Sequence, residues 1–372
     1  MKKIIINTIP LLTELTGIGR YTYEISKYLE KDPTFDTTFY YGYTTKTLIH
    51  KDSNIEVKKL KKIISAVPLL KRVIKKIIRV YHQNFIKTYD LYFEPNFIPN
   101  NSINSKKTIT AVHDFSFLLH KEFHPKERIK YFEDNFLQNI YRSDKIIAFS
   151  NFTKQEILQK LNFKEEDIKV IYHGVRHDLF KKLTDTSLGF DLPEKFIFSV
   201  GSIEPRKNLI GLLKAFDKLD LQIKNQYKLV LAGFKGWENK EIMKIISQNK
   251  DNIIYLGYIS DEDLVKVYNK ATCFIYPSFY EGFGLPPLEA MACGTPVICS
   301  NVSSIPEVGE DAVLYCDPYS IDDIKDKLEL LLKDENLQKE LSQKGQNQAQ
   351  KFTWEKSANE HIKLFQELLQ RD

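Results

Sequence analysis

The chain alternates short apolar runs, rich in β-branched and aromatic residues, with longer segments of helical periodicity, in two successive series. The first series predicts strands at Lys3–Asn7, Thr38–Tyr41, Leu91–Glu94, Thr108–His113, Lys145–Phe149 and Lys169–Tyr172. The second series predicts strands at Phe196–Val200, Lys228–Ala232, Ile253–Leu256, Cys273–Tyr276, Val297–Cys299 and Val313–Tyr315. Strands that alternate with helices form parallel sheets covered by helices on both faces. The pattern therefore predicts two Rossmann-like α/β domains, with a ligand at the carboxyl ends of their strands.

The length of the chain supports this division. A single hydrophobic core stops growing beyond about 250–300 residues, and this chain has 372. The polar stretch 176–193 is the predicted linker. We place a first domain at residues 1–178 and a second at residues 188–354. Helical periodicity in the first domain predicts helices at Gly19–Leu29 and Thr153–Leu161.

The composition is that of an ordinary soluble globular protein, with 42% hydrophobic and 28% charged residues. No run of about 18 apolar residues occurs, so no membrane-spanning helix is predicted. The start MKKIIINTIPLL is interpreted as a strand, because its apolar run is brief and no small-residue cleavage site comes after it. The 4 cysteines show no C-x-x-C spacing, which predicts reduced, buried thiols in a cytoplasmic protein.

Positive charge is concentrated in residues 57–88, which contain many lysines and arginines and no acidic residue. Apolar residues recur there at helical spacing, and Pro68 is expected to break or kink the helix. A basic amphipathic helix is typical of contact with an anionic membrane surface. The alternative is a domain helix whose apolar stripe packs on the sheet and whose lysines are solvated. A nucleic acid partner is not expected, because aromatic stacking residues are not interleaved with the charges.

Residues 281–297, EGFGLPPLEAMACGTPV, are the segment most informative about function. Glu281 and Glu289 stand on either side of a glycine-bracketed turn and the pair Pro286–Pro287. A proline pair fits a helix start, which places Glu289 in the first helical turn and Glu281 just before the turn. A helix amino terminus is a ready site for an anion. Each glutamate alone could equally be a capping residue, but the whole string favours a ligand site.

This string resembles the E-x7-E signature of the retaining glycosyltransferases of family 4, which adopt the two-domain GT-B fold. Its flanks agree: SVGSIEPRKNLIGLLKAF (199–216) resembles the phosphate-binding segment of the family, and VICSNVSSIPEVGEDAVLYCDP (297–318) resembles the family's segment after the second glutamate. The resemblance covers residues 196–318 closely, and 1–25 and 108–175 more loosely. It implies two Rossmann-like domains whose parallel sheets face each other across a cleft. It also implies that the final helix, about Ser357–Leu369 within 355–372, packs back on the first domain.

The resemblance assigns a donor site to the second domain. Arg206 and Lys207 hold the donor diphosphate, whose charge grows as the glycosidic bond breaks. Glu289 binds the ribose hydroxyls, and Glu281 meets the donor sugar near its anomeric carbon as a nucleophile, an ion-pair stabiliser or a positioning group. The remaining donor contacts expected in this domain are Gly201, Ser202, Tyr258 and the residues around the helix start, Phe283, Gly284 and Leu285.

In the first domain, TGIGRY (16–21) comes after the first strand and opens a helix. Its glycines let a backbone approach a phosphate, although the spacing is not that of a dinucleotide motif. The resemblance makes Gly17 a wall of the donor cleft, with Gly19 and Arg20 as neighbours. His113 ends a predicted strand, and its family counterpart contacts the hydroxyls of the donor sugar, so we assign it to the catalytic group together with Glu281, Arg206 and Lys207. Asp114 is expected beside it in the donor site.

Other polar residues are set aside. Asp261, Glu262 and Asp263 resemble a metal-binding D-x-D motif, but they come after Ser260 and open a helix, so we interpret them as capping residues. His120, His124 and His173 lack metal-ligand spacing, and a hinge role is the safer interpretation of His173. No P-loop motif occurs. We expect no metal and no cofactor beyond the donor itself.

These observations predict a retaining glycosyltransferase that moves a hexose from a nucleotide-diphosphate sugar to a glycan or lipid-linked saccharide in cell-surface polysaccharide synthesis. The motif GIGRY and the stretch HDFSFLLHKEFHP (113–125) look most like mannosyltransferases that use GDP-mannose. A transferase of the same fold that uses a UDP-sugar is the first alternative, and a non-catalytic relative that binds sugar nucleotides is the second. The expected location is the cytoplasm or, through residues 57–88, the inner face of the plasma membrane.

Overall fold

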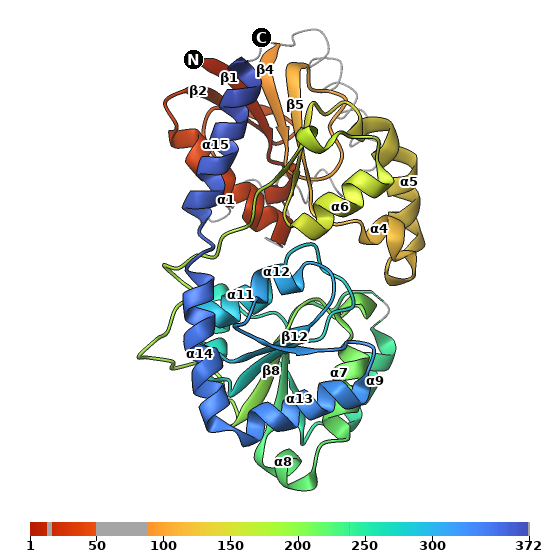
Figure 1. The fold of residues 1–372 in the computed structure, drawn as a ribbon, viewed down its shortest axis with the longest axis vertical. Coiled ribbons are helices and arrows are strands. Elements are labelled where there is room, and N and C mark those ends of the chain that lie inside the picture. The colour runs from red at the N-terminus through yellow and green to blue at the C-terminus, as the bar shows by residue number, and fades with distance from the viewer. Residues whose placement is uncertain (13–16, 50–87, 238, 371–372) are drawn as a thin grey trace, which may run out of the picture.

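The computed structural model describes residues 1–12, 17–49, 88–237 and 239–370, which form two α/β domains stacked end to end (Figure 1). Within these residues the first domain has a seven-stranded sheet in the order β3-β2-β1-β4-β5-β6-β7. The second has a six-stranded sheet in the order β10-β9-β8-β11-β12-β13. The described strand pairs are parallel, except that β2 and β3 are antiparallel. The α/β class with two parallel-sheet domains, predicted from the alternation of elements, is confirmed.

The first domain carries its site-forming loops after strands at the centre of the sheet. Its strands are β1 (Lys2–Asn7), β2 (Phe35–Tyr40), β3 (Thr44–Thr45), β4 (Tyr89–Glu94), β5 (Ser105–Val112), β6 (Lys145–Ala148) and β7 (Ile168–Val170). Its helices are η1 (Ile9–Leu12), α1 (Gly17–Lys31), α4 (Ser116–Leu119), η3 (Lys121–Phe123), α5 (Lys126–Ile140), α6 (Asn151–Lys160) and η4 (Glu165–Asp167). The carboxyl ends of β1, β5 and β6 lead into α1, α4 and α6, so these helices begin on the side that faces the second domain (Figure 1).

The second domain repeats this plan with shorter connections. Its strands are β8 (Phe196–Val200), β9 (Lys228–Ala232), β10 (Ile253–Tyr255), β11 (Cys273–Tyr276), β12 (Val297–Ser300) and β13 (Leu314–Cys316). Its helices are η5 (Pro205–Lys207), α7 (Leu209–Asp217), α8 (Leu221–Gln226), α9 (Lys240–Gln248), α10 (Asp261–Lys270), α11 (Leu285–Ala292), α12 (Ile305–Gly309), α13 (Ile321–Lys333) and α14 (Glu335–Ala349). Its central strands β8, β9, β11 and β12 are almost wholly buried, as expected for a parallel sheet covered on both faces.

Local chemistry fixes where the helices near the domain interface begin. Ser150 caps α6 by accepting a hydrogen bond from the Thr153 amide, and Ser260 caps α10 by accepting one from Asp263. Asn208 caps α7 with its side chain while adopting a left-handed φ of 54°. Helix α11 starts with the sequence Leu-Pro-Pro, because proline at the first positions sacrifices no intrahelical hydrogen bond.

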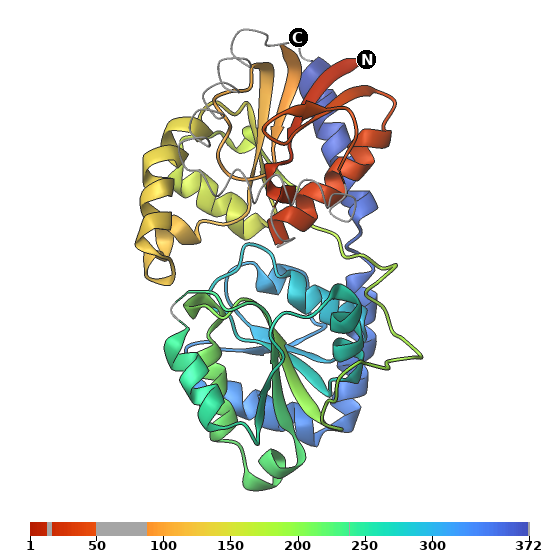
Figure 2. The same cartoon turned by 180° about the vertical axis from the view of Figure 1, so that it is seen from behind.

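The chain crosses between the domains twice, once before β8 and once before the final helix α15 (Trp354–Gln370). The two crossing segments are in close contact, because a Cβ on Gly174 would lie 2.1 Å from the Trp354 amide nitrogen. Helix α15 returns to the first domain and packs beside α1 (Figure 2). There the Tyr21 hydroxyl donates a 2.7 Å hydrogen bond to Nε2 of His361, whose Nδ1 donates to the Ser357 carbonyl, and Phe365 packs against Phe93.

Several sequence expectations differ from the structure. Helices α5 and α14 were not predicted, because their apolar stripes are diluted by charged and amide residues. Helix α13 was not predicted either, although its buried Ile324, Leu328 and Leu331 have helical spacing. Glu289 was expected in the first turn of its helix, but that is wrong: α11 begins at Leu285, so Glu289 lies just past the first turn. The basic segment predicted as an amphipathic helix, 57–88, lies outside the described residues except at its end.

Candidate donor and catalytic site

A cluster of two cations and one carboxylate lies where the second sheet ends toward the first domain. Arg206 and Lys207 form the short helix η5 after β8, and Glu281 comes after β11, the neighbouring strand. The Glu281 carboxylate receives Arg206 Nη1 at 2.8 Å and Lys207 Nζ at 2.7 Å. Arg206 also contacts Glu204 at 2.9 Å. The adjacent strands therefore bring together three of the four residues predicted to be catalytic.

Burial makes the electrostatics of this cluster strong. Burial alone would raise the pKa of Glu281, but the charges of Arg206 and Lys207 outweigh it and lower the pKa to about 2. Burial and the neighbouring Arg206 lower the pKa of Lys207. Burial also opposes the charge of Arg206, but Glu281 and Glu204 overcome it and raise the pKa. The cluster therefore sets two basic side chains, Arg206 and Lys207, against the carboxyl groups of Glu281 and Glu204.

Neighbouring polar groups hold the cluster rigidly. The Tyr276 hydroxyl donates to Glu281 Oε1 at 2.9 Å and receives a hydrogen bond from Lys207. The Glu281 amide donates to Ser303 Oγ at 3.0 Å, and Ser304 Oγ donates to the Glu281 carbonyl at 2.8 Å. These contacts fix both the backbone and the side chain of Glu281, as a preorganised reaction centre requires.

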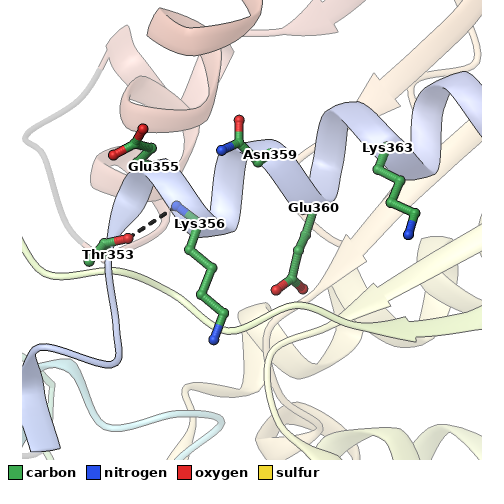
Figure 3. Close-up of a pocket in the computed structure, with 6 residues that line it drawn as sticks. All are labelled: Thr353, Glu355, Lys356, Asn359, Glu360 and Lys363. Carbon is green, nitrogen blue, oxygen red and sulfur yellow. Dashed lines mark hydrogen bonds between the residues drawn. The ribbon is translucent and has the colours of Figure 1, made fainter.

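Beside this cluster is a small cavity at the carboxyl ends of β8 and β9. Its lining includes Gly201, Ser202, Lys207 and Tyr276. Gly233 adopts a φ of +130°, and a Cβ there would lie 2.0 Å from the Gly201 carbonyl oxygen, so the two loops approach at backbone distance. Gly201 and Ser202, both predicted in the donor site, thus lie next to Lys207. A second hollow, on the outer face of α15, is lined by alternating acids and lysines and includes none of the predicted residues (Figure 3).

The second predicted glutamate lies in an ion-pair network that joins the domains. Arg20 of α1 pairs with Glu289 through Nη1 and with Asp261 through Nη2, the latter at 2.8 Å. Arg176 of the connecting segment reaches the other oxygen of Asp261 at 2.9 Å. Burial, partly offset by Arg20, raises the pKa of Glu289 to about 7. The network brings Arg20 and Glu289 together. Both residues were predicted from the sequence to belong to the donor site.

Asp261 corrects an expectation from the sequence. The capping interpretation is right for its helix, because Ser260 Oγ accepts from the Asp263 amide and donates to the Asp263 carboxylate at 2.9 Å. Asp261 itself has a further role, since it pairs with Arg20 of the first domain and with Arg176 of the connecting segment. Sequence reasoning missed this role because both partners are far away in the chain.

Aromatic residues lie just after the ends of β9 and β10, next to this network. Phe234 and Tyr258 stack with ring centroids 4.6 Å apart and planes 21° apart. Tyr258 is 63% exposed, and together with Glu289 and Asp261 it raises the pKa of Arg20 against the effect of burial. An exposed ring backed by a second ring offers a flat surface to a planar ligand.

His113 lies at the end of β5, against the second domain, and is nearly buried. Its Nε2 hydrogen-bonds the Pro95 carbonyl at 2.7 Å, and because a carbonyl only accepts, Nε2 carries the proton. Burial lowers the pKa of His113 to about 4, so the ring is neutral and Nδ1 is an acceptor. Its neighbour Asp114 accepts hydrogen bonds from the amide and hydroxyl of Ser116, at 2.8 and 2.6 Å, and thereby fixes the start of α4.

The loop that carries Glu281 is fastened directly to the first domain. A Cβ on Gly282 would lie 1.8 Å from the His113 carbonyl oxygen, so only glycine permits this approach. Ser150 Oγ donates to the Gly282 carbonyl at 3.0 Å. Tyr280 inserts between the Phe115 amide, which donates to its hydroxyl at 2.9 Å, and Glu156, which accepts from it.

The remaining predicted residues line the same interface. Gly17 begins α1, and a Cβ on it would meet Leu285 Cδ1 at 3.8 Å, so the starts of α1 and α11 face each other. Gly19 lies in the first turn of α1 and is buried there. Gly284 precedes α11 with a φ of +124°, and Phe283 is buried beside it. Glu307 of α12 accepts hydrogen bonds from the Asn151 and Phe152 amides at 2.8 and 2.6 Å, an inter-domain contact that the sequence did not reveal.

Comparisons with known proteins agree with this geometry. The family described as Glycosyltransferase Family 4 matches residues 15–179, and the family described as Glycosyl transferases group 1 matches residues 180–348. O-antigen chain mannosyltransferase B of Escherichia coli is 32% identical over 98% of this chain and 99% of its own length. The chain belongs to the family 4, group 1 glycosyltransferases. This glycosyltransferase is also 33% identical, over 71% of its length, to the serotype-specific mannosyltransferase WbdA of Escherichia coli, of which it spans 34%.

Solved structures show the same fold for this glycosyltransferase. Sucrose-phosphate synthase of Thermosynechococcus elongatus superposes over 100% of both chains with a TM-score of 0.74 at 20% identity. WaaG, a glycosyltransferase involved in lipopolysaccharide biosynthesis, superposes over 96% of this chain and 98% of its own with a TM-score of 0.66 at 13% identity. The GT-B architecture expected from the sequence resemblance is thereby confirmed.

Neither a metal-ligand cluster nor a membrane-spanning helix is found among the described residues of this glycosyltransferase. Among them, no group of three or more histidine, cysteine, aspartate or glutamate side chains is arranged to hold a metal ion. No helix that the structure describes is long and apolar enough to cross a membrane.

Proposed function

We propose that this glycosyltransferase transfers mannose from GDP-mannose to a saccharide acceptor during the synthesis of a cell-surface polysaccharide, with retention of the anomeric configuration. The observation that carries the proposal is the buried Arg206–Lys207–Glu281 cluster at the domain interface. Mannose and polysaccharide synthesis are supported by the relative that matches almost the whole chain, an O-antigen chain mannosyltransferase. The donor lies mainly on the second domain and the acceptor on the first.

The diphosphate of the donor binds Arg206 and Lys207. As the bond to the sugar breaks, negative charge moves onto the leaving phosphate, and two fixed cations stabilise it without reorganisation. The cavity bounded by Gly201 and Ser202 adjoins Lys207 and provides backbone contact for the phosphates. We infer that the transfer needs no metal ion and no other cofactor, because these two side chains supply the positive charge at that point.

The nucleoside binds beside the inter-domain network. The ribose hydroxyls donate to Glu289, whose Oε1 is held by Arg20. The base stacks on Tyr258, which is itself backed by Phe234. A purine covers more of such a ring than a pyrimidine does, which supports a purine base such as guanine over uracil.

The sugar lies between the domains. A hydroxyl of mannose donates to Nδ1 of the neutral His113, and Glu281 lies against the ring near the anomeric carbon. The low pKa of Glu281 keeps it ionised at neutral pH, so it stabilises positive charge on the sugar as the bond to phosphate breaks. The two cations that lower this pKa also weaken Glu281 as a nucleophile, which favours its stabilising or positioning role.

A thermal-shift panel of nucleotide sugars tests the donor. We expect GDP-mannose to raise the Tm more than UDP-glucose, UDP-N-acetylglucosamine or ADP-glucose at the same concentration, because the ligand with the lowest Kd stabilises the folded state most. A ligand at about 100 times its Kd stabilises the folded state by about 2.7 kcal/mol. A shift with UDP-sugars instead would favour the UDP-dependent alternative. Binding without any transfer to saccharide acceptors would favour a non-catalytic sugar-nucleotide-binding protein, and no shift at all would contradict the donor site.

We further propose that the enzyme works at the cytoplasmic face of the plasma membrane, held by its basic segment. The support is the sequence of residues 57–88, which joins many basic residues and no acid to an amphipathic apolar pattern. In a flotation assay, the protein should bind vesicles that contain about 30% anionic lipid and dissociate at high salt. Replacing Lys75, Lys76 and Arg79 by glutamine should weaken this binding, whereas unchanged flotation would contradict the proposal.

A further inference from the structure

Four aromatic rings form a row that crosses the domain interface. His120 and Phe123, both before α5, stack with centroids 5.5 Å apart and planes 17° apart. Phe123 faces Phe279 of the second domain at 5.7 Å and 7°, and Phe279 faces Tyr319 at 5.0 Å and 29°. The rings are thus nearly parallel to their neighbours, although they come from three separate loops in two domains.

This row is anchored to the reaction centre. The Phe279 amide donates to the Arg206 carbonyl at 3.0 Å, and His120 packs against Tyr280 at 4.8 Å, the residue before Glu281. The carbonyl of Pro318, next to Tyr319, accepts from the Asn208 side chain at 2.7 Å. Trp237 of the second domain donates to the Phe123 carbonyl, which fixes the first-domain end of the row.

The rings are not part of a closed core. Tyr319 is 68% exposed, and the other three are only partly buried. Charged groups border them, with Lys121 and Glu122 beside His120 and Asp317 accepting from the Tyr319 amide at 2.9 Å. Exposed aromatic surface with a polar border is a feature of interaction sites and ligand-binding grooves.

We propose that this aromatic row, defined as His120, Phe123, Phe279 and Tyr319, binds the saccharide chain of the acceptor behind the sugar that is being extended. The C–H face of a pyranose is apolar and packs on an aromatic ring, while its hydroxyls stay at the polar border. Lipid is a poorer fit, because the exposed aromatic surface is a single row of rings bordered by charges. The inference rests on the proposed function and adds to it a second region of acceptor recognition, partly on the donor domain.

The test compares acceptors of different length. With methyl mannoside and a mannotetraose as acceptors, Tyr319→Ala should raise the KM for the tetrasaccharide about three- to tenfold and leave that for the monosaccharide unchanged. The KM for GDP-mannose should not change. Tyr319→Phe, which keeps the ring, should behave as the wild type. Tyr141→Ala, at an exposed tyrosine at the far end of α5, is the matched control and should change neither KM.

Binding measured without donor separates this inference from the proposed function. Titration calorimetry of mannotetraose should show weaker binding to Tyr319→Ala than to the wild type or Tyr141→Ala. If the wild type binds mannotetraose in this way but does not turn over GDP-mannose, the proposed function fails and the row stands as a saccharide site. Equal affinity in all three proteins, or equal changes in KM for short and long acceptors, would overturn the aromatic row.

Discussion

Arg206→Ala is expected to lower kcat/KM about 10²- to 10³-fold, the range seen when one fixed group that stabilises developing charge is removed. The variant keeps Lys207 but leaves one cation to balance both the leaving diphosphate and Glu281. Removing Arg206 also takes away the 2.8 Å ion pair that helps lower the pKa of Glu281. We expect a lower kcat, measured by steady-state kinetics, together with weaker GDP binding, measured by calorimetry.

Two controls keep this result interpretable. Arg142→Ala removes an arginine that is exposed and contacts Asn101 at the surface, and it should retain wild-type kinetics. A melting curve of Arg206→Ala reports whether the variant folds, since Glu281 and Glu204 lose a buried partner. A folded Arg206→Ala enzyme with near-wild-type turnover would show that the cluster is not the reaction centre.

Gly282→Ala is expected to reduce kcat/KM by about 10², because displacement of a reacting group by about 1 Å has an effect of that size. The new Cβ would lie 1.8 Å from the His113 carbonyl oxygen and 2.9 Å from Asp114 Cβ. Since the first of these is backbone, the loop that carries Glu281 must move away from the first domain. GDP affinity should change little, because Arg206 and Lys207 lie on η5 after β8, a different loop from the one that carries Gly282.

Gly189→Ala is the matched control for this substitution. Gly189 lies in the connection between the domains, and a Cβ there would meet nothing within 4 Å. Steady-state kinetics should therefore be unchanged in Gly189→Ala. If Gly282→Ala were as active as Gly189→Ala, the close contact between Gly282 and His113 would have no part in catalysis.

The fold could be predicted from the sequence to a large extent. The buried strands of the second domain are nearly pure apolar runs, so Phe196–Val200, Lys228–Ala232 and Cys273–Tyr276 were placed residue for residue. Helix α14 was missed because glutamine, asparagine and lysine fill most of its positions and only a few side chains are buried. Helix α5 was missed for a similar reason, since its buried positions are few and include an asparagine.

The candidate site could be predicted where its residues lie close together in the chain. Arg206–Lys207 and the segment from Glu281 to Glu289 stand out as local patterns. Contacts between the domains left no such pattern: Asp261 pairs with Arg20 across a separation of 241 residues, and Tyr280 reaches Glu156 across 124. Contacts of that kind depend on how the two domains meet, which neither periodicity nor spacing specifies.

The product formed from GDP-mannose and a mannoside acceptor tests the central claim most directly. NMR of the product, with GDP release measured in parallel, gives both the linkage and the stoichiometry. The account predicts one GDP per mannose transferred, an α-linkage that retains the configuration of the donor, and at least about 10²-fold less product from Arg206→Ala over the same time. A β-linked product, or equal product from Arg206→Ala, would contradict it.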